Sequence, residues 1–183
     1  MKILVLGLGN DLIADDAAGI LAARRVREAI ESGGLPRTSE DFRVDVIECS
    51  VSGVALLDVF AGYDRAIVID SVLTGKFPPG TVQELDPARL GAVLAPSAHY
   101  SGLPEILAIA RELAVPFPRE IEILALEVAD PHTIGGEISE PVRSALPALA
   151  ERVLARLRTW HESAACGGGP GDRAPAPRPP ESP

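Results

Sequence analysis

The chain has 183 residues, 46% of them hydrophobic, which suffices for one domain with a sizeable core. Its 26 acidic residues outnumber 17 lysines and arginines and give a formal charge of −9. This balance excludes the basic surface needed for binding nucleic acid or a membrane surface. No apolar run approaches the roughly 18 to 20 residues of a membrane span, and residues 2–8 are too short a run for a secretory signal. We therefore expect a cytoplasmic protein.

Predicted strands and helices alternate along the chain. Apolar runs or period-two alternation predict strands over residues 2–8, 43–48, 66–70, 81–85 and 120–126. Apolar residues at helical spacing, bounded by glycine, serine or proline, predict helices over residues 17–32, 54–62, 101–113 and 139–160. Such alternation is typical of an α/β fold. We expect a single three-layer domain, with a mostly parallel, twisted sheet of about five strands and helices on both faces.

The last part of the chain changes in composition. From Ser163 onward it consists mainly of glycine, proline, alanine and charged residues. This segment has no apolar side chains to pack, so we expect a domain over residues 1–162 and a disordered tail over residues 163–183. Pro147 falls within the last predicted helix and either bends it or marks where it begins.

The segment after the first strand contains two glycines and two aspartates. Gly7 and Gly9 suggest a dinucleotide-binding loop, but Leu12 occupies the position of the third glycine. Asp15 and Asp16 stand just before the first helix, where carboxylates would repel a pyrophosphate, so we reject that interpretation. One aspartate suffices to cap the helix and complement its dipole. We expect the other to point into the crevice at the carboxyl ends of the strands.

Two further side chains follow the same pattern. Asp70 ends the buried strand 66–70, and His99 lies just before the helix 101–113. Sites in such sheets form at the carboxyl ends of the strands. Together with Asp16, these residues are a suitable ligand set for nickel, zinc, iron or manganese, or an acid–base group without metal. The H-E-x-x-H and G-x-S-x-G motifs of zinc proteases and serine hydrolases are absent from the sequence.

The cysteines and the remaining histidines carry weaker signals. Cys49 and Cys166 form neither a C-x-x-C pair nor a disulfide framework. We expect Cys49 to be a small buried thiol rather than a nucleophile. His132 lies in the loop after the last strand and could face the crevice, whereas His161 is expected in solvent after the last helix.

Three segments resemble the hydrogenase maturation protease family: ILVLGLGNDLIADDAAG, GVALLDVFAGYDRAIVIDSV and SAHYSGLPEILAIA. The family pattern is a strand followed by G-x-G-N-x-L-x-x-D-[ED], a strand ending in aspartate, and a histidine shortly before a helix. The resemblance runs from Met1 to about Leu157 and implies a phosphorylase/hydrolase-like fold. It also implies that the metal-contacting positions are Asp16, Asp70 and His99. Asp16 often corresponds to glutamate in the family.

The resemblance also implies an activity. It points to an aspartic-type endopeptidase that removes the C-terminal extension from the nickel-loaded precursor of a [NiFe]-hydrogenase large subunit. Asp16, Asp70 and His99 would sense the nickel of that precursor, and Asp16 or Asp70 would activate the attacking water. Where the family commonly has D-G-G-T, this chain reads Glu48-Cys49-Ser50-Val51, which puts its substrate range in question. We expect a monomer.

Two other functions are weighed against this one. The first is a non-catalytic nickel-binding chaperone in hydrogenase assembly, which would bind the precursor without shortening it. The second is a peptidyl-tRNA hydrolase-like enzyme, because those proteins also begin with a strand and G-L-G-N. They require an early catalytic histidine and a basic face, but this chain is acidic and its first histidine is His99.

Overall fold

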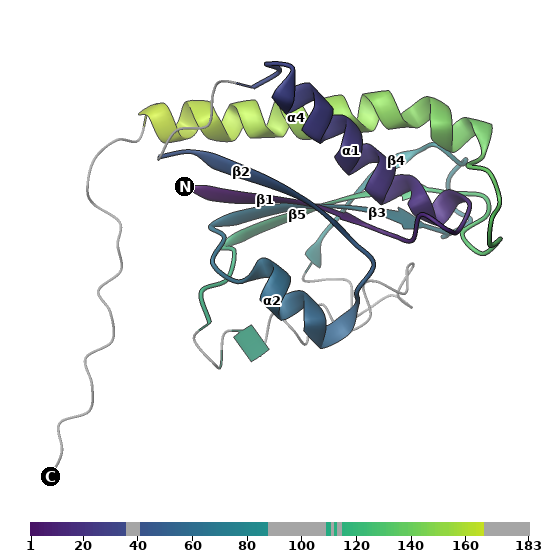
Figure 1. Ribbon diagram of the computed structural model, residues 1–183, viewed down its shortest axis with the longest axis horizontal. Helices are drawn as coiled ribbons and strands as arrows, with labels where there is room; N and C mark the ends of the chain where they lie inside the picture. The colour runs from purple at the N-terminus through teal and green to yellow at the C-terminus, as the bar shows by residue number, and fades with distance from the viewer. Residues whose placement is uncertain (36–40, 88–108, 111, 113–114, 167–183) are drawn as a thin grey trace, which may run out of the picture.

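The fold is a five-stranded sheet with helices on both faces, as the sequence predicts. A computed structural model describes residues 1–35, 41–87, 109–110, 112 and 115–166 (Figure 1). The strand order is β2-β1-β3-β5-β4, with β4 antiparallel to β5 and the other pairs parallel. The strands are β1 (Lys2–Leu8), β2 (Arg43–Cys49), β3 (Arg65–Val72), β4 (Val82–Leu85) and β5 (Glu120–Glu127).

The helices form two layers around the sheet (Figure 1). On one face, α1 and α4 pack against each other and against β1, β3 and β5, while α2 covers the other face. Short 3-10 turns, η1 and η2, lead into α1 and α2 respectively. The bounds are η1 (Asp15–Ala17), α1 (Ala18–Glu31), η2 (Gly53–Ala55), α2 (Leu56–Phe60) and α4 (Glu140–Cys166).

The central strands are apolar throughout because both of their faces are covered. In β1, Ile3 and Val5 join the cluster under α1 and α4, whereas Leu4 and Leu6 join the cluster under α2. Successive side chains of a strand point to opposite faces. A continuous apolar run is therefore what a strand buried between two helical layers requires.

The predicted end of the last helix and the predicted exposure of His161 need correction. The last helix begins at Glu140 with Pro147 exposed in its interior, and it ends at Cys166 rather than near Trp160. It continues because the residues before the glycine run are alanine-rich and favour helix. His161 therefore lies inside α4, where its ring packs edge-on against Phe42 at 4.7 Å between centroids, instead of standing in solvent.

Several predictions fall where the structure gives no description. Most of the predicted helix 101–113 and residues 167–183 of the predicted tail lie outside the described residues. Within the described part of the chain, no helix is both long and apolar enough to cross a bilayer. The cytoplasmic location stays a prediction.

Candidate active site

Glycines let α1 begin directly above the ends of two central strands. A Cβ atom added at Gly19, in the first turn of α1, would lie 2.1 Å from the carbonyl oxygen of Leu8 and 2.5 Å from that of Ile69. A Cβ atom at Gly7 would lie 2.5 Å from the carbonyl oxygen of Gly19. The start of α1 therefore contacts the backbone at the ends of β1 and β3 (Figure 1). In the sheet, β2 lies on one side of β1 and β3 lies on the other, so that the strand order reverses between β1 and β3. Ligands of open α/β sheets bind at such a reversal point.

The second glycine of the opening motif fixes the turn that follows β1. Gly9 has a φ of 146°, and a Cβ atom there would lie 2.1 Å from the carbonyl oxygen of Asp16. Asn10 closes the next turn because its Oδ1 accepts a hydrogen bond from the backbone N–H of Leu12 at 3.0 Å. Close backbone packing thus explains the G-x-G of this chain without a bound nucleotide.

The two aspartates predicted for the site both hydrogen-bond Ser71, through different groups of that serine. Asp70 lies within β3 and is fully buried, and its Oδ1 accepts the backbone N–H of Ser71 at 2.7 Å. The hydroxyl of Ser71 donates to Oδ1 of Asp16 at 3.1 Å. Asp16 is half-buried in η1. The structure therefore brings both carboxylates to the carboxyl edge of the sheet.

Ser71 is a site residue that the sequence reasoning missed. It is buried and directly follows Asp70 in β3. Alternation along the strand places it on the face opposite to that of Asp70, the face covered by α1. Ser71 could have been identified in the sequence as a hydroxyl residue directly beside a candidate aspartate at the end of a buried strand.

Asp15 has a different role from the one expected. It is fully buried, and its carboxylate accepts backbone N–H groups from Ala129 and Asp130, both at 3.0 Å, and from Ser139 at 2.7 Å. The Ser139 hydroxyl adds a fourth hydrogen bond at 2.9 Å. The N-cap positions of η1 and α1 are both alanines without a capping side chain. The expectation that an aspartate caps this helix is therefore wrong, because the buried amide groups of the loop after β5 bind that carboxylate instead.

Glu127 is a second buried carboxylate that the sequence reasoning missed. It accepts hydrogen bonds from the backbone N–H and hydroxyl of Thr74, at 2.8 and 2.7 Å. The backbone N–H of Gly75 and the side-chain amide of Gln83 donate two more, both at 2.7 Å. Glu127 thus fixes the loop between β3 and β4, as Asp15 fixes the loop between β5 and α4. In the sequence it looks like a solvated residue at a strand end.

The end of β2, where the chain begins to depart from the family pattern, is bound to α1 by ion pairs. The Glu48 carboxylate accepts hydrogen bonds from Arg24 at 2.8 Å and from Arg27 at 2.5 Å. Burial raises the pKa of Glu48, but the hydrogen bonds from Arg27 and Arg24 outweigh it, so that the pKa is lowered overall. Cys49, which follows, is a half-buried free thiol.

The histidine predicted for the site cannot be placed. His99 lies outside the described residues, so its position relative to Asp16 and Asp70 stays a prediction. Within the described part of the chain, no group of three or more histidine, cysteine, aspartate or glutamate side chains is arranged to hold a metal ion. His132 is exposed, and its backbone N–H donates to the Asp130 carboxylate at 3.1 Å.

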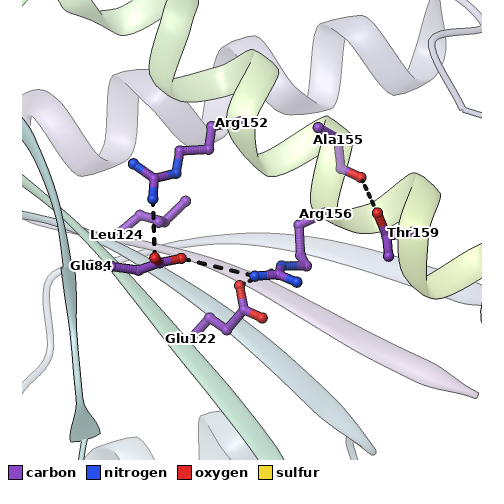
Figure 2. A pocket seen from close by; sticks show the side chains of 7 residues that line it. All are labelled: Glu84, Glu122, Leu124, Arg152, Ala155, Arg156 and Thr159. Carbon is purple, nitrogen blue, oxygen red and sulfur yellow. Dashed lines mark hydrogen bonds and ion pairs between the residues drawn. The ribbon is translucent and has the colours of Figure 1, made fainter.

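A pocket between the sheet and α4 is lined by charges that neutralise one another (Figure 2). Arg152 contacts Glu84 at 3.2 Å, and Arg156 contacts Glu122 at 2.8 Å and Glu84 at 3.9 Å. Burial raises the pKa of Glu122, and Arg156 partly opposes that rise. The pairing and the position, away from the strand ends, indicate an ion-pair network between α4 and the sheet rather than a reactive site.

The sequence is similar to those of hydrogenase maturation proteases. The sequence profile of the hydrogenase maturation protease family (HycI) matches residues 25–156, a span that includes Asp70 and begins after Asp16. The chain is also 32% identical over 162 residues to the hydrogenase 2 maturation protease of Escherichia coli (strain K12). That match covers 86% of this chain and 92% of the relative.

Solved structures agree with the sequence match. The hydrogenase maturating endopeptidase HybD from E. coli has a TM-score of 0.70 and 26% identity, over 87% of this chain and 94% of that one. The [NiFe] hydrogenase maturation protease HybD from Thermococcus kodakarensis has a TM-score of 0.60 and 25% identity, over 86% and 99% of the two chains. The profile alone spans well over half of the sequence. The chain belongs to the hydrogenase maturation protease family, and it is a peptidase.

Proposed function

We propose that this peptidase removes the C-terminal extension from the nickel-loaded precursor of a [NiFe]-hydrogenase large subunit. The observation that carries the proposal is that Asp16 and Asp70 both lie at the carboxyl edge of the sheet, where each hydrogen-bonds a different group of Ser71. Family membership supplies the substrate class, since solved relatives are named as [NiFe] hydrogenase maturation proteases.

The donor set fits a metal ion that arrives with the substrate. Carboxylate oxygens and imidazole nitrogens bind divalent first-row metals, nickel included. Asp16 and Asp70 supply two such carboxylates at the same edge of the sheet, and His99 is the proposed third ligand. A cation bound by both carboxylates would be attracted to each of them. A precursor that carries nickel would therefore bind more tightly than one without it.

The two carboxylates differ in access to water, which suggests different tasks. Asp70 is fully buried, whereas Asp16 is half-buried. We assign to Asp16 the role of general base, which takes a proton from the water that attacks the scissile carbonyl carbon and returns it to the leaving amine. Asp70 would hold the metal of the substrate. The hydroxyl of Ser71 orients the Asp16 carboxylate through its hydrogen bond.

Substitution of each aspartate tests the proposal. Asp16→Asn and Asp70→Asn should each slow processing of the nickel-loaded precursor by at least about 100-fold, the range expected for loss of a general base. The readout is the mass of the large subunit before and after incubation. Asp58→Asn, an exposed aspartate of α2, is the matched control and should process normally.

The alternatives give different outcomes. A non-catalytic nickel chaperone would bind the loaded precursor and leave its mass unchanged in the wild-type incubation. Normal processing by both Asp16→Asn and Asp70→Asn would contradict the assigned roles. Cleavage of a nickel-free precursor at the same rate would show that the two carboxylates do not sense the metal.

A further inference from the structure

Exposed apolar side chains gather at the edge of the sheet that holds Asp16 and Asp70. They lie in the segments that follow β1, β2, β3 and β5, one of them in η2, and parallel strands end at the same edge. We call these six residues the apolar rim: Leu12, Val51, Val54, Leu73, Phe77 and Ile134. Only one other large apolar side chain of the described residues, Ile109, is exposed.

Single exposed apolar residues are common on any protein surface and do not indicate a binding site. Their gathering on one edge is typical of an interaction site. Ile109 belongs to the segment before β5. In that segment Pro116 accepts a hydrogen bond from Gly62, near the start of β3, so the segment reaches the opposite edge of the sheet.

The backbone holds two residues of the apolar rim in place although their side chains are exposed. Leu12 is 67% exposed and Ile134 is 80% exposed. Their segments form an antiparallel bridge between Ile13 and Ile134, and the N–H of Gly135 donates to the carbonyl of Leu12 at 2.7 Å. A rigid apolar surface loses little conformational entropy when a partner covers it.

Leu12 and Ile134 are continuous with the candidate active site. The segment that carries Leu12 leads directly into η1, which contains Asp16. The buried carboxylate of Asp15 ties the same η1 to the loop that carries Ile134, through the N–H groups of Ala129 and Asp130. A protein that binds Leu12 and Ile134 therefore lies beside the two site carboxylates.

We infer that the apolar rim is the docking surface for the large-subunit precursor, with Leu12 and Ile134 as the contacts nearest the scissile bond. This inference rests on the proposed function, from which the occupant is taken. An endopeptidase that selects one bond in a protein must hold that protein beside its reactive groups. The apolar rim would do so by burying its exposed side chains against an apolar surface of the precursor.

The test measures binding and processing separately. The host's own nickel-loaded large-subunit precursor is incubated with wild-type protein, Leu12→Ser/Ile134→Ser and the control Ile109→Ser. We expect the double variant to bind the precursor about tenfold more weakly and to raise KM by a similar factor, with kcat unchanged at saturation. Ile109→Ser should match the wild type, and the conservative single variant Ile134→Leu, with Leu12 unchanged, should keep most of the affinity.

The possible results separate this inference from the proposed function. Wild-type binding without cleavage, weakened in Leu12→Ser/Ile134→Ser, would refute the proposed function and support the docking surface. Normal cleavage with unchanged precursor affinity and KM in the double variant would overturn the docking surface alone. Loss of kcat with KM unchanged would also overturn it. A wild-type dimer that the double variant converts to monomer, with unchanged precursor affinity, would show that a second copy covers the apolar rim.

Discussion

Ser139 donates two hydrogen bonds to the buried carboxylate of Asp15, from its backbone N–H at 2.7 Å and from its hydroxyl at 2.9 Å. The same carboxylate accepts the backbone N–H groups of Ala129 and Asp130. One side chain thus closes the loop between β5 and α4 and fixes it to η1. Because the next residue is Asp16, this carboxylate also positions the candidate general base.

Asp15→Asn should destabilise the fold by about 3 kcal/mol, because an amide NH2 group replaces one acceptor oxygen among buried N–H donors. Urea unfolding of the variant and the wild type measures the difference. Asp58→Asn, on the exposed side of α2, should change the free energy of unfolding by less than about 0.5 kcal/mol. Equal effects of the two substitutions would show that the buried carboxylate does not organise the loop.

The sequence could place the strands but could not assign the two neighbouring aspartates. A strand buried on both faces, such as β1, leaves a continuous apolar run that is visible in the sequence. Asp15 and Asp16 are chemically identical, and only their distant partners, Ser139 for one and Ser71 for the other, separate their roles. Those partners depend on tertiary structure, which local pattern does not encode.

The roles of Glu127 and Gly19 also depend on tertiary structure and could not be predicted from the sequence. Glu127 ends a strand that also contains Glu120 and Glu122, so that it looks solvated until the loop after β3 folds over it. Gly19 looks like an ordinary helix residue until the ends of β1 and β3 are placed beneath it. The position of Asp70 at the carboxyl edge of the sheet could be predicted because it directly follows an apolar run, whereas its role in the site stays a prediction.

Gly19→Ala should destabilise the protein by about 3 kcal/mol or more. Its Cβ would lie 2.1 Å from the carbonyl oxygen of Leu8 and 2.5 Å from that of Ile69, and neither backbone can move freely in the sheet. Thermal and urea unfolding measure the loss. Gly33→Ala is the control: its φ is 89°, but no atom lies within 4 Å of the added Cβ, so it should lose only about 1 kcal/mol. A smaller loss at Gly19 than at Gly33 would contradict the close packing.

Glu127→Gln should loosen the loop between β3 and β4 while the sheet persists. The backbone N–H groups of Thr74 and Gly75 both donate to Oε1 of this carboxylate, and an amide is a weaker acceptor than a carboxylate. We expect at least about tenfold faster hydrogen exchange at these two amides, corresponding to about 1.4 kcal/mol of lost protection. Amide exchange in the central strand β1 should change less. The substitution Glu31→Gln, at an exposed residue at the end of α1, serves as control, and equal exchange in both variants would exclude the proposed anchoring.

The ion pairs between α1 and β2 give a prediction about pH. The Glu48 side chain is 23% exposed and accepts hydrogen bonds from Arg24 and Arg27. Burial raises its pKa, and the two guanidinium groups lower it by more, so that the folded-state pKa lies below the unfolded value. A lowered pKa means that the interaction stabilises the fold fully above the unfolded pKa, about 4.3, and is lost as pH falls through the folded value.

A double-mutant cycle with Glu48→Gln and Arg27→Gln isolates this contribution from other titrating groups. At pH 7 the coupling free energy between Glu48 and Arg27 should be about 1 kcal/mol, because the pair is charge-assisted but only partly buried. The coupling should shrink as the pH falls through the lowered folded-state pKa of Glu48, since a protonated carboxyl group loses its attraction to the guanidinium. Urea unfolding of the four proteins at several pH values provides the measurement. A coupling that stays constant from pH 7 to the acid limit of folding would show that the carboxylate charge does not hold β2 to α1.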